Sequence, residues 1–258
     1  MVFSVFENPI AYCAALFVGL LLFMELGRRI GQNRLARDPE AANAGTGAVD
    51  GVLFALFGLL VAFTFSGAAS RFDDRRAMIV DEANDIGTAY LRIDLLPTAS
   101  QPALRDAFHR YVDSRLAAYQ DSSGIESFNE AFGKSKLVQS EIWKLAVAAG
   151  QQPDAPPAAN MLLLPAINNM IDITSTRATA MLFHPPLPIF AMLIGTALVC
   201  SLLAGLAMMR SRSPKWIHMV GFSAIMTVTM YVIADLEYPR IGVIQVSGFD
   251  YLLKEAVQ

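Results

Sequence analysis

The sequence predicts an all-α membrane protein with four transmembrane helices and a helical-bundle domain outside the membrane, between the second and third helices. Its composition is the first reason: 54% of the 258 residues are hydrophobic and 17% are charged, which is too apolar for a soluble domain and too charged for a chain wholly in lipid. The apolar residues also gather in four long runs, and the segment between runs two and three has helical periodicity. We expect three parts: 1–69 with spans one and two, 70–184 as the bundle, and 185–258 with spans three and four and a tail.

Four apolar runs have the length of membrane spans: Pro9–Leu26, Gly51–Ala69, Pro188–Met209 and Trp216–Ala234. A helix of about 20 residues crosses roughly 30 Å of hydrocarbon. A cleaved signal peptide is the alternative for the first run, but it needs basic residues before the run. Here Glu7 precedes the run and the positive charges follow it, which favours an uncleaved span.

The positive charges predict the orientation of the spans. Two loops are basic, the first with Arg28, Arg29, Arg34 and Arg37, and the second with Arg210, Arg212 and Lys215. Loops rich in Arg and Lys stay in the cytoplasm, so the inserted domain is expected on the opposite side. Arg71, Arg75 and Arg76, at the far end of span two, count against this orientation.

The inserted domain reads as four helices. Ile79, Ala83, Ile86, Tyr90 and Ile93 form one apolar stripe on a helix that continues out of span two and stops at Pro97. Further helices are expected from Gln101, over Ile125–Ala149 and over Asn160–Phe183, with a loop at Gly150–Pro157. Amphipathic helices must bury their stripes, and a four-helix bundle does so.

No catalytic or cofactor motif is recognisable. His109, His184 and His218 are too far apart for metal-ligand spacing, and Gly45-Thr46-Gly47 lacks the third glycine of a dinucleotide site. The net charge of −3 does not favour nucleic acid. The sequence therefore predicts neither an enzyme nor a metal, cofactor or nucleic-acid partner.

Span two has two contrasting faces. One carries small residues that allow close helix packing: Gly51, Ala55, Gly58, Ala62 and Ser66. Another carries the candidates for lining a pore: Phe54, Phe57, Val61 and Phe65. Such a stripe either packs against neighbours or forms a hydrophobic constriction that gates ions by dewetting. Small residues recur on span three at Ala197, Ser201 and Gly205, which favours tight assembly with further copies.

Polar residues gather where the first and last bundle helices adjoin the spans. The candidates for a polar network or an ion-binding rim are Arg75, Arg76, Glu82, Asn84, Asn168, Asp172 and Arg177, with Asp235 at the end of span four. A structural clamp is the alternative interpretation. A carboxylate near lipid needs a partner or water, so Asp235 is expected at the interface or lining a vestibule. Glu25 is expected to pair with Arg28 and Arg29 along its own helix.

Several motifs together carry a family resemblance: Arg71-Phe72-Asp73-Asp74-Arg75-Arg76, Asp81-Glu82-Ala83-Asn84, Ile86-Gly87-Thr88-Ala89-Tyr90, His184-Pro185-Pro186, and the single residues Asn168, Asp172, Arg177, Asp235, Pro239 and Gly242. They resemble a bacterial membrane-protein family of unknown function, numbered 4239 and labelled bestrophin-like. The resemblance covers nearly the whole chain. It implies a protein of the bacterial inner membrane, similar to bestrophins, which are pentameric anion channels with a phenylalanine-lined neck on span two.

Two functions follow as hypotheses. The first is a homo-oligomeric ion channel, for anions by the family label, whose pore is lined by span two and whose partners are copies of itself, the lipid bilayer and inorganic anions. Arg28, Arg29 and Arg210 would concentrate anions at the cytoplasmic mouth. The second is a membrane-anchored sensor or scaffold whose bundle binds a ligand or partner protein.

Overall fold

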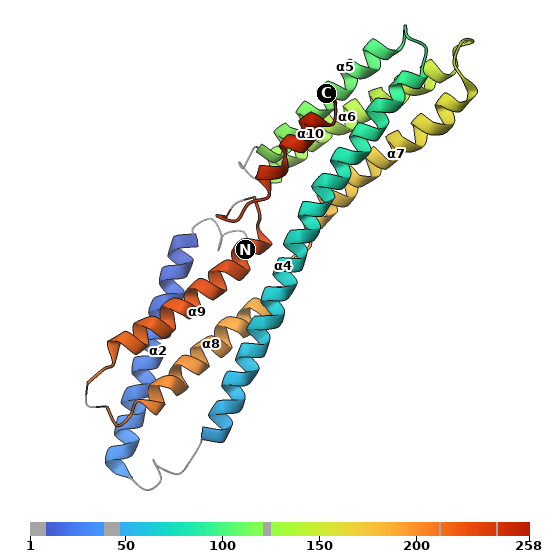
Figure 1. Cartoon of the computed structure of the whole chain (residues 1–258). Helices are drawn as coiled ribbons and strands as arrows, with labels where there is room; N and C mark the ends of the chain where they lie inside the picture. The colour runs from blue at the N-terminus through green and yellow to red at the C-terminus, as the bar shows by residue number, and fades with distance from the viewer. Residues whose placement is uncertain (1–8, 39–46, 121–124, 212, 241) are drawn as a thin grey trace. The chain divides into compact units, whose positions relative to one another are not determined.

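A computed structural model describes residues 9–38, 47–120, 125–211, 213–240 and 242–258, and every regular element among them is helical (Figure 1). In chain order the helices are α2 (Pro9–Arg37), α4 (Gly47–Leu91), the 3-10 turn η1 (Arg92–Leu95), α5 (Gln101–Gln120), α6 (Ile125–Gly150), α7 (Pro157–Ala180), α8 (Leu187–Ala207), α9 (Trp216–Glu237), the 3-10 turn η2 (Ser247–Phe249) and α10 (Tyr251–Glu255). Glu7, Gly45, Thr46 and Arg212, which the sequence interpretation used, lie outside the described residues.

Four helices are long and apolar enough to cross a membrane: α2, α4, α8 and α9. This confirms the four predicted spans. Helix α4 has 45 residues, which makes it about 68 Å long, more than twice the thickness of a bilayer core. Only its apolar first half therefore spans, and its second half belongs to the bundle, as the sequence predicted. The helix ends at Leu91, followed by η1 and then Pro97, which disfavours helix before it.

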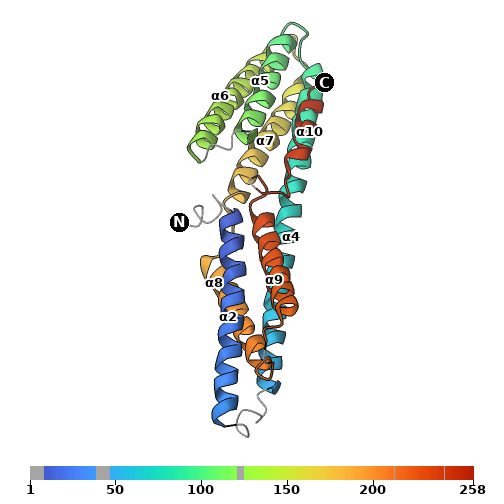
Figure 2. The ribbon, with the colours of Figure 1, turned by 90° about the vertical axis from the view of Figure 1, so that its left-hand side faces the viewer.

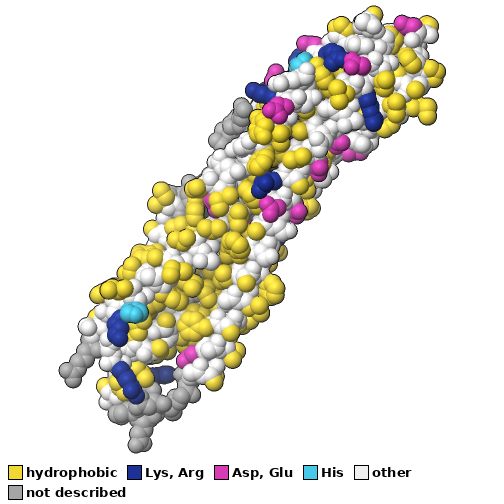
Figure 3. Space-filling view, viewed as in Figure 1, with side chains coloured by type: hydrophobic (Ala, Val, Ile, Leu, Met, Phe, Trp, Pro, Cys, Tyr) yellow, Lys and Arg dark blue, Asp and Glu magenta, His cyan; other side chains and the backbone are white. Residues whose placement is uncertain are grey.

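The chain divides into two compact units, which we describe separately. The first contains Met1–Ser70 and His184–Glu237, and the second contains Arg71–Phe183 and Tyr238–Gln258. The C-terminal segment therefore groups with the bundle, whereas the sequence interpretation grouped it with spans three and four. In Figure 3 the helix faces of the first unit are largely hydrophobic, whereas acidic and basic side chains are interspersed over the second.

Within the first unit, α2 packs against α8 and α9. The contact between α2 and α8 brings backbone against backbone, because a methyl group on Gly205 would overlap the carbonyl oxygen of Met24 and one on Gly27 would overlap that of Leu202. Small residues four apart allow such an approach in membranes. The sequence analysis expected the small residues of span three to pack against other copies. One of them, Gly205, contacts α2 of its own protomer.

We expect Gly205→Ala to destabilise the protein by about 1–3 kcal/mol, because the added methyl group must push two helix backbones apart. The control is Gly195→Ala on the same helix, where an added Cβ meets no atom within 4 Å. Thermal unfolding of both variants in detergent checks this. Equal unfolding temperatures for the two variants would contradict the close approach of α2 and α8.

The second unit is a four-helix bundle formed by the end of α4 with α5, α6 and α7 (Figure 2). Its core contains the predicted α4 stripe, including Ile86, Tyr90 and Ile93, packed with Leu104, Phe108 and Ile142. Leu253 and Val257 from the C-terminal segment belong to the same core. The predicted bundle is therefore present, with a short additional helix that the sequence interpretation missed.

Candidate pore helix and buried ion cluster

The small-residue face of α4 is exposed along the whole span. Gly51, Ala55, Gly58, Ala62 and Ser66 are all exposed, and a Cβ added to Gly51 or Gly58 would meet no atom within 4 Å. Among the described residues of the protomer, this face therefore has no packing partner. It differs in this respect from the small residues of α2 and α8, which are in backbone contact.

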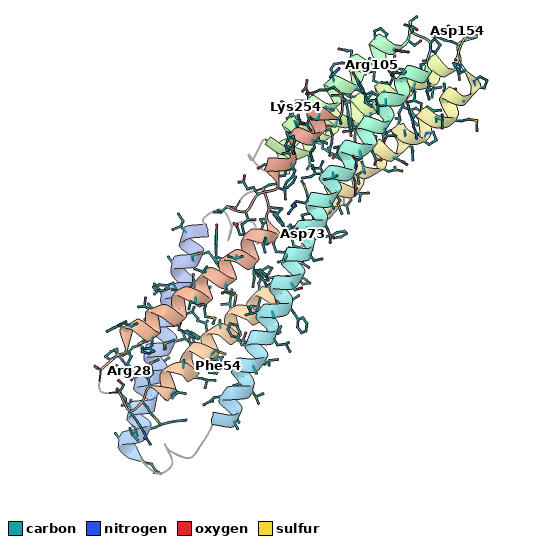
Figure 4. The ribbon with its side chains drawn as sticks, viewed as in Figure 1. Arg28, Phe54, Asp73, Arg105, Asp154 and Lys254 are labelled. Atoms are coloured by element: carbon teal, nitrogen blue, oxygen red, sulfur yellow. The ribbon has the colours of Figure 1, made fainter. Side chains whose placement is uncertain are left out.

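The aromatic stripe of α4 lies mostly on the inner side of the helix. Phe57 is only 3% exposed and belongs to a core cluster with Leu20 and Leu193, against which Phe54 and Val61 also pack. Figure 4 labels Phe54 on α4. Phe65 is 43% exposed. At about 100° per residue, the small-residue face is centred about 140° around the helix from Phe57, and Phe54 and Val61 lie beside Phe57.

A buried ion cluster joins three helices of the bundle. The Glu82 carboxylate on α4 accepts hydrogen bonds from Arg115 Nε on α5 at 2.6 Å and Arg115 Nη2 at 3.3 Å. It also accepts one from Arg177 Nη1 on α7, and all three side chains are buried. Burial by itself would raise the pKa of Glu82, but the guanidiniums of Arg115 and Arg177 outweigh it and hold this pKa below its ordinary value.

A neutral polar network joins α5, α6 and α7. Tyr111 Oη and Thr174 Oγ1 are 2.8 Å apart, and Gln139 Nε2 donates to Thr174 Oγ1 at 3.1 Å. Burial raises the pKa of Tyr111, so its hydroxyl stays protonated. Buried polar groups that are this well paired fix the register of helices.

The comparisons with known proteins decide the family. The model of the Bestrophin-like domain matches residues 13–248. The chain belongs to the Bestrophin-like family. No curated protein matches it.

Crystal structures of single-substitution variants of a bacterial bestrophin homologue from Klebsiella pneumoniae share the fold of this Bestrophin-like protein. One has a TM-score of 0.70 at 14% identity, covering 93% of this chain and 98% of that chain. A second has a TM-score of 0.67 at 14% identity, covering 95% and 97%. The resemblance to bestrophin-like proteins predicted from the sequence motifs is thereby confirmed, as is the all-α membrane fold.

The predicted polar candidates of this Bestrophin-like protein fall into separate places. Glu82 and Arg177 meet in the buried cluster. Arg75 Nη2 donates to the Phe183 carbonyl at 2.8 Å and its Nε to the Ala180 carbonyl at 3.4 Å, where a cation stabilises the C-terminal end of α7. The other predicted polar candidates lie elsewhere. Arg76 and Asn84 are exposed, Asn168 and Asp172 hydrogen-bond to each other, and Asp235 is buried at the end of α9.

Arg115 was missed by the sequence interpretation. It follows Leu104, Phe108 and Tyr111 at steps of three and four, so its place on an apolar stripe was the signal that it is buried. A charged residue on such a stripe needs a buried partner of opposite charge. No group of three His, Cys, Asp or Glu side chains in the described part of the chain could hold a metal ion.

Within the first unit, Glu25 pairs with two arginines of its own helix, α2, as predicted. Its Oε1 lies 2.7 Å from Arg28 Nη2 and 2.8 Å from Arg29 Nε, and Figure 4 labels Arg28. Arg28 is buried and Arg29 is exposed. Of the three arginines expected to concentrate anions, Arg28 and Arg29 therefore share one carboxylate.

Proposed function

We propose that this protein is a homo-oligomeric ion channel, a pentamer by analogy with bestrophins, whose pore is lined by the exposed face of α4. One observation carries the proposal: α4 has a continuous exposed face of small residues from Gly51 to Ser66, turned away from the face that Phe57 buries in its own protomer. In a closed ring, copies of this face can surround a common axis.

The exposed face suits a channel wall. Small side chains leave the lumen open, whereas the larger exposed residues beside them, Leu59 and Phe63, can contact neighbouring copies. Phe65 is the sequence candidate that lies at the edge of this face and is our proposed hydrophobic constriction. Phe54, Phe57 and Val61 then support the wall from inside the protomer.

The permeant ion that we propose is an anion. The support is the basic residues at one end of the spans: Arg34 and Arg37 in the last turn of α2 and Lys215 just before α9 are exposed and raise the local anion concentration. We also propose that the protein lies in the bacterial inner membrane with the bundle on the extracytoplasmic side, an orientation that these basic residues support.

A cation channel is the second candidate, because α4 carries exposed carboxylates beyond its spanning half. Asp74 and Asp81 are exposed on the same side of the helix, and rings of carboxylates attract cations.

Reconstitution of the purified chain in liposomes tests both candidates. We expect chloride flux well above that of empty liposomes, and under a KCl gradient a reversal potential close to the chloride equilibrium potential. A reversal potential near that of potassium would favour the carboxylates of α4 as the selecting groups. Absence of any ion flux, together with a monomeric or dimeric chain, would refute the channel and favour the sensor or scaffold.

A further inference from the structure

Polar side chains form a stripe along α9, the fourth span. Its members follow one another at steps of four residues: Ser223, Thr227, Tyr231 and Asp235. Neighbours at this spacing lie within about 40° of each other around a helix. Ser223, Thr227 and Asp235 are 0%, 8% and 5% exposed, and Tyr231 is half-buried, so the stripe faces the inside of the first unit. It extends for about 18 Å along the helix axis, more than half the thickness of a bilayer core.

Helix α8 adds a buried hydroxyl at the same depth. Ser201 is 0% exposed and lies about 9 Å from the end of α8, whereas Ser223 lies about 10 Å from the start of α9. A short connection joins these two helix ends, so the two serines lie at similar depths. Both helices pack against α2 (Figure 1). Ser201 is one turn from Gly205, where α8 touches the α2 backbone at Met24 and Arg28.

Three of these hydroxyls are buried without a hydrogen-bond partner among the residues that the structure describes: those of Ser201, Ser223 and Thr227. Other hydroxyls of the spans donate to the backbone carbonyl four residues earlier. They are Thr64, Thr196 and Thr229, which donate to Leu60, Met192 and Ile225. The three buried hydroxyls do not use this local acceptor. A buried hydroxyl without a partner is costly, and water is the smallest ligand that both donates to it and accepts from it.

The surroundings of the hydroxyls are too closely packed for a hydrated ion. The backbones of α2 and α8 touch at Gly205. Leu20 and Met24 on α2 and Met219 on α9 are all 0% exposed. Packing of this density holds single water molecules at polar groups. The ligand that fits these hydroxyls is therefore water.

Carboxylates lie at both ends of this group of hydroxyls. At one end, Glu25 on α2 pairs with the buried Arg28. At the other end, Asp235 and Glu237 are buried in the last turn of α9, and Glu237 Oε2 lies 3.8 Å from His184 Nδ1. Proton relays in membrane proteins are built from carboxylates and histidines of this kind.

We propose that water molecules held by Ser201, Ser223 and Thr227 form a proton path inside each protomer, from Glu25 to the buried carboxylates at the end of α9. Tyr231 is the polar residue between Thr227 and those carboxylates. Protons move along such a path by passing between hydrogen-bonded oxygens, so no ion has to enter it. The path is separate from the exposed face of α4, and it depends neither on the proposed channel nor on an oligomer.

Proton flux into liposomes tests the path. The purified chain is reconstituted with a pH-sensitive dye inside, in potassium gluconate, and valinomycin sets the membrane potential. We expect proton flux at least fivefold above that of empty liposomes. Thr227→Val keeps the shape of the side chain but removes its hydroxyl, and it should return the flux to the level of empty liposomes. The matched control is Thr229→Val on the same helix, whose hydroxyl is already bonded to Ile225 and whose loss should leave proton flux unchanged.

A bulky residue on α4 distinguishes the path from the proposed pore. Ala62→Trp lies on the exposed small-residue face, so it should leave proton flux unchanged. Proton flux that is lost in Ala62→Trp and kept in Thr227→Val would assign the protons to the pore and overturn the path. A parent chain with no proton flux above empty liposomes would also overturn the path, whether or not that chain conducts chloride.

Thermal unfolding in detergent tests the bound water independently. If water holds the Thr227 hydroxyl, Thr227→Val loses those hydrogen bonds, and we expect the unfolding temperature to fall by about 2–4 °C. If the hydroxyl is dry, the same substitution removes a costly buried polar group, and the unfolding temperature rises. A rise would overturn the water site and the path with it. A fall with unchanged proton flux would overturn the path and leave the water site.

Discussion

Replacing Glu82 by Ala should lower the free energy of unfolding of the bundle by about 3–5 kcal/mol, because two arginines would remain buried without the carboxylate that they share. Arg115 and Arg177 reach Glu82 from α5 and α7, so the loss should loosen three helices together. Thermal unfolding of the full chain in detergent, followed by circular dichroism, measures it.

The neighbouring Asp81→Ala is the control for this prediction. Asp81 is exposed, and such surface substitutions change stability by no more than about 0.5 kcal/mol. A triple variant that replaces Glu82, Arg115 and Arg177 by Leu, Met and Met should recover much of the stability, because a buried ion cluster can be exchanged for apolar residues of similar volume. If Glu82→Ala and Asp81→Ala unfold alike, the cluster does not stabilise the bundle.

The same cluster predicts acid sensitivity. The pKa of Glu82 is lowered in the folded protein against the opposing effect of its burial. A carboxyl group of this kind stabilises the fold at all pH values above its ordinary pKa, and its contribution disappears as the pH falls through the lowered value. The wild-type bundle should therefore lose stability below about pH 4.3, and the triple apolar variant should lose less over the same range. Parallel pH profiles would contradict this.

The spans and the bundle could be predicted from the sequence because each depends on a pattern that one helix carries alone. Runs of about 20 apolar residues prefer hydrocarbon, and the stripe of Ile79, Ile86 and Ile93 requires a partner surface. The meeting of Glu82 and Arg177 was also foreseen, because both lie on helices that adjoin spans. The spans and the stripe needed no knowledge of which helices touch, whereas the Glu82–Arg177 pair needed only that the first and last bundle helices both adjoin spans.

The inner face of α4 and the docking of α10 depend on contacts between distant residues. Phe57 and Ala62 are both apolar, so hydropathy does not say which one faces the protomer and which is exposed. The C-terminal segment offers Leu253 and Val257 as a signal, one turn of apolar spacing that is too short to distinguish from a tail. In both cases the deciding information is the shape of the surface that receives the side chain.

A large side chain on the small-residue face of α4 should block conduction. Ala62 is exposed on this face, so Ala62→Trp disturbs no packing within the protomer, yet in a ring it would place one indole per copy in the proposed lumen. We expect ion flux to fall at least tenfold, with unchanged thermal stability and oligomer size. Flux through liposomes and native mass measurement together check this.

Two further variants separate the pore from packing. Val228→Trp puts the same side chain on α9, where Val228 is 60% exposed, and should leave flux unchanged because we expect this face to meet lipid. Phe57→Ala removes a buried ring and should cost about 3 kcal/mol of stability with conductance per assembled channel retained. If Ala62→Trp instead dissociates the oligomer, the small residues form contacts between copies, and the pore wall must be assigned to the neighbouring Leu59 and Phe63 side of α4.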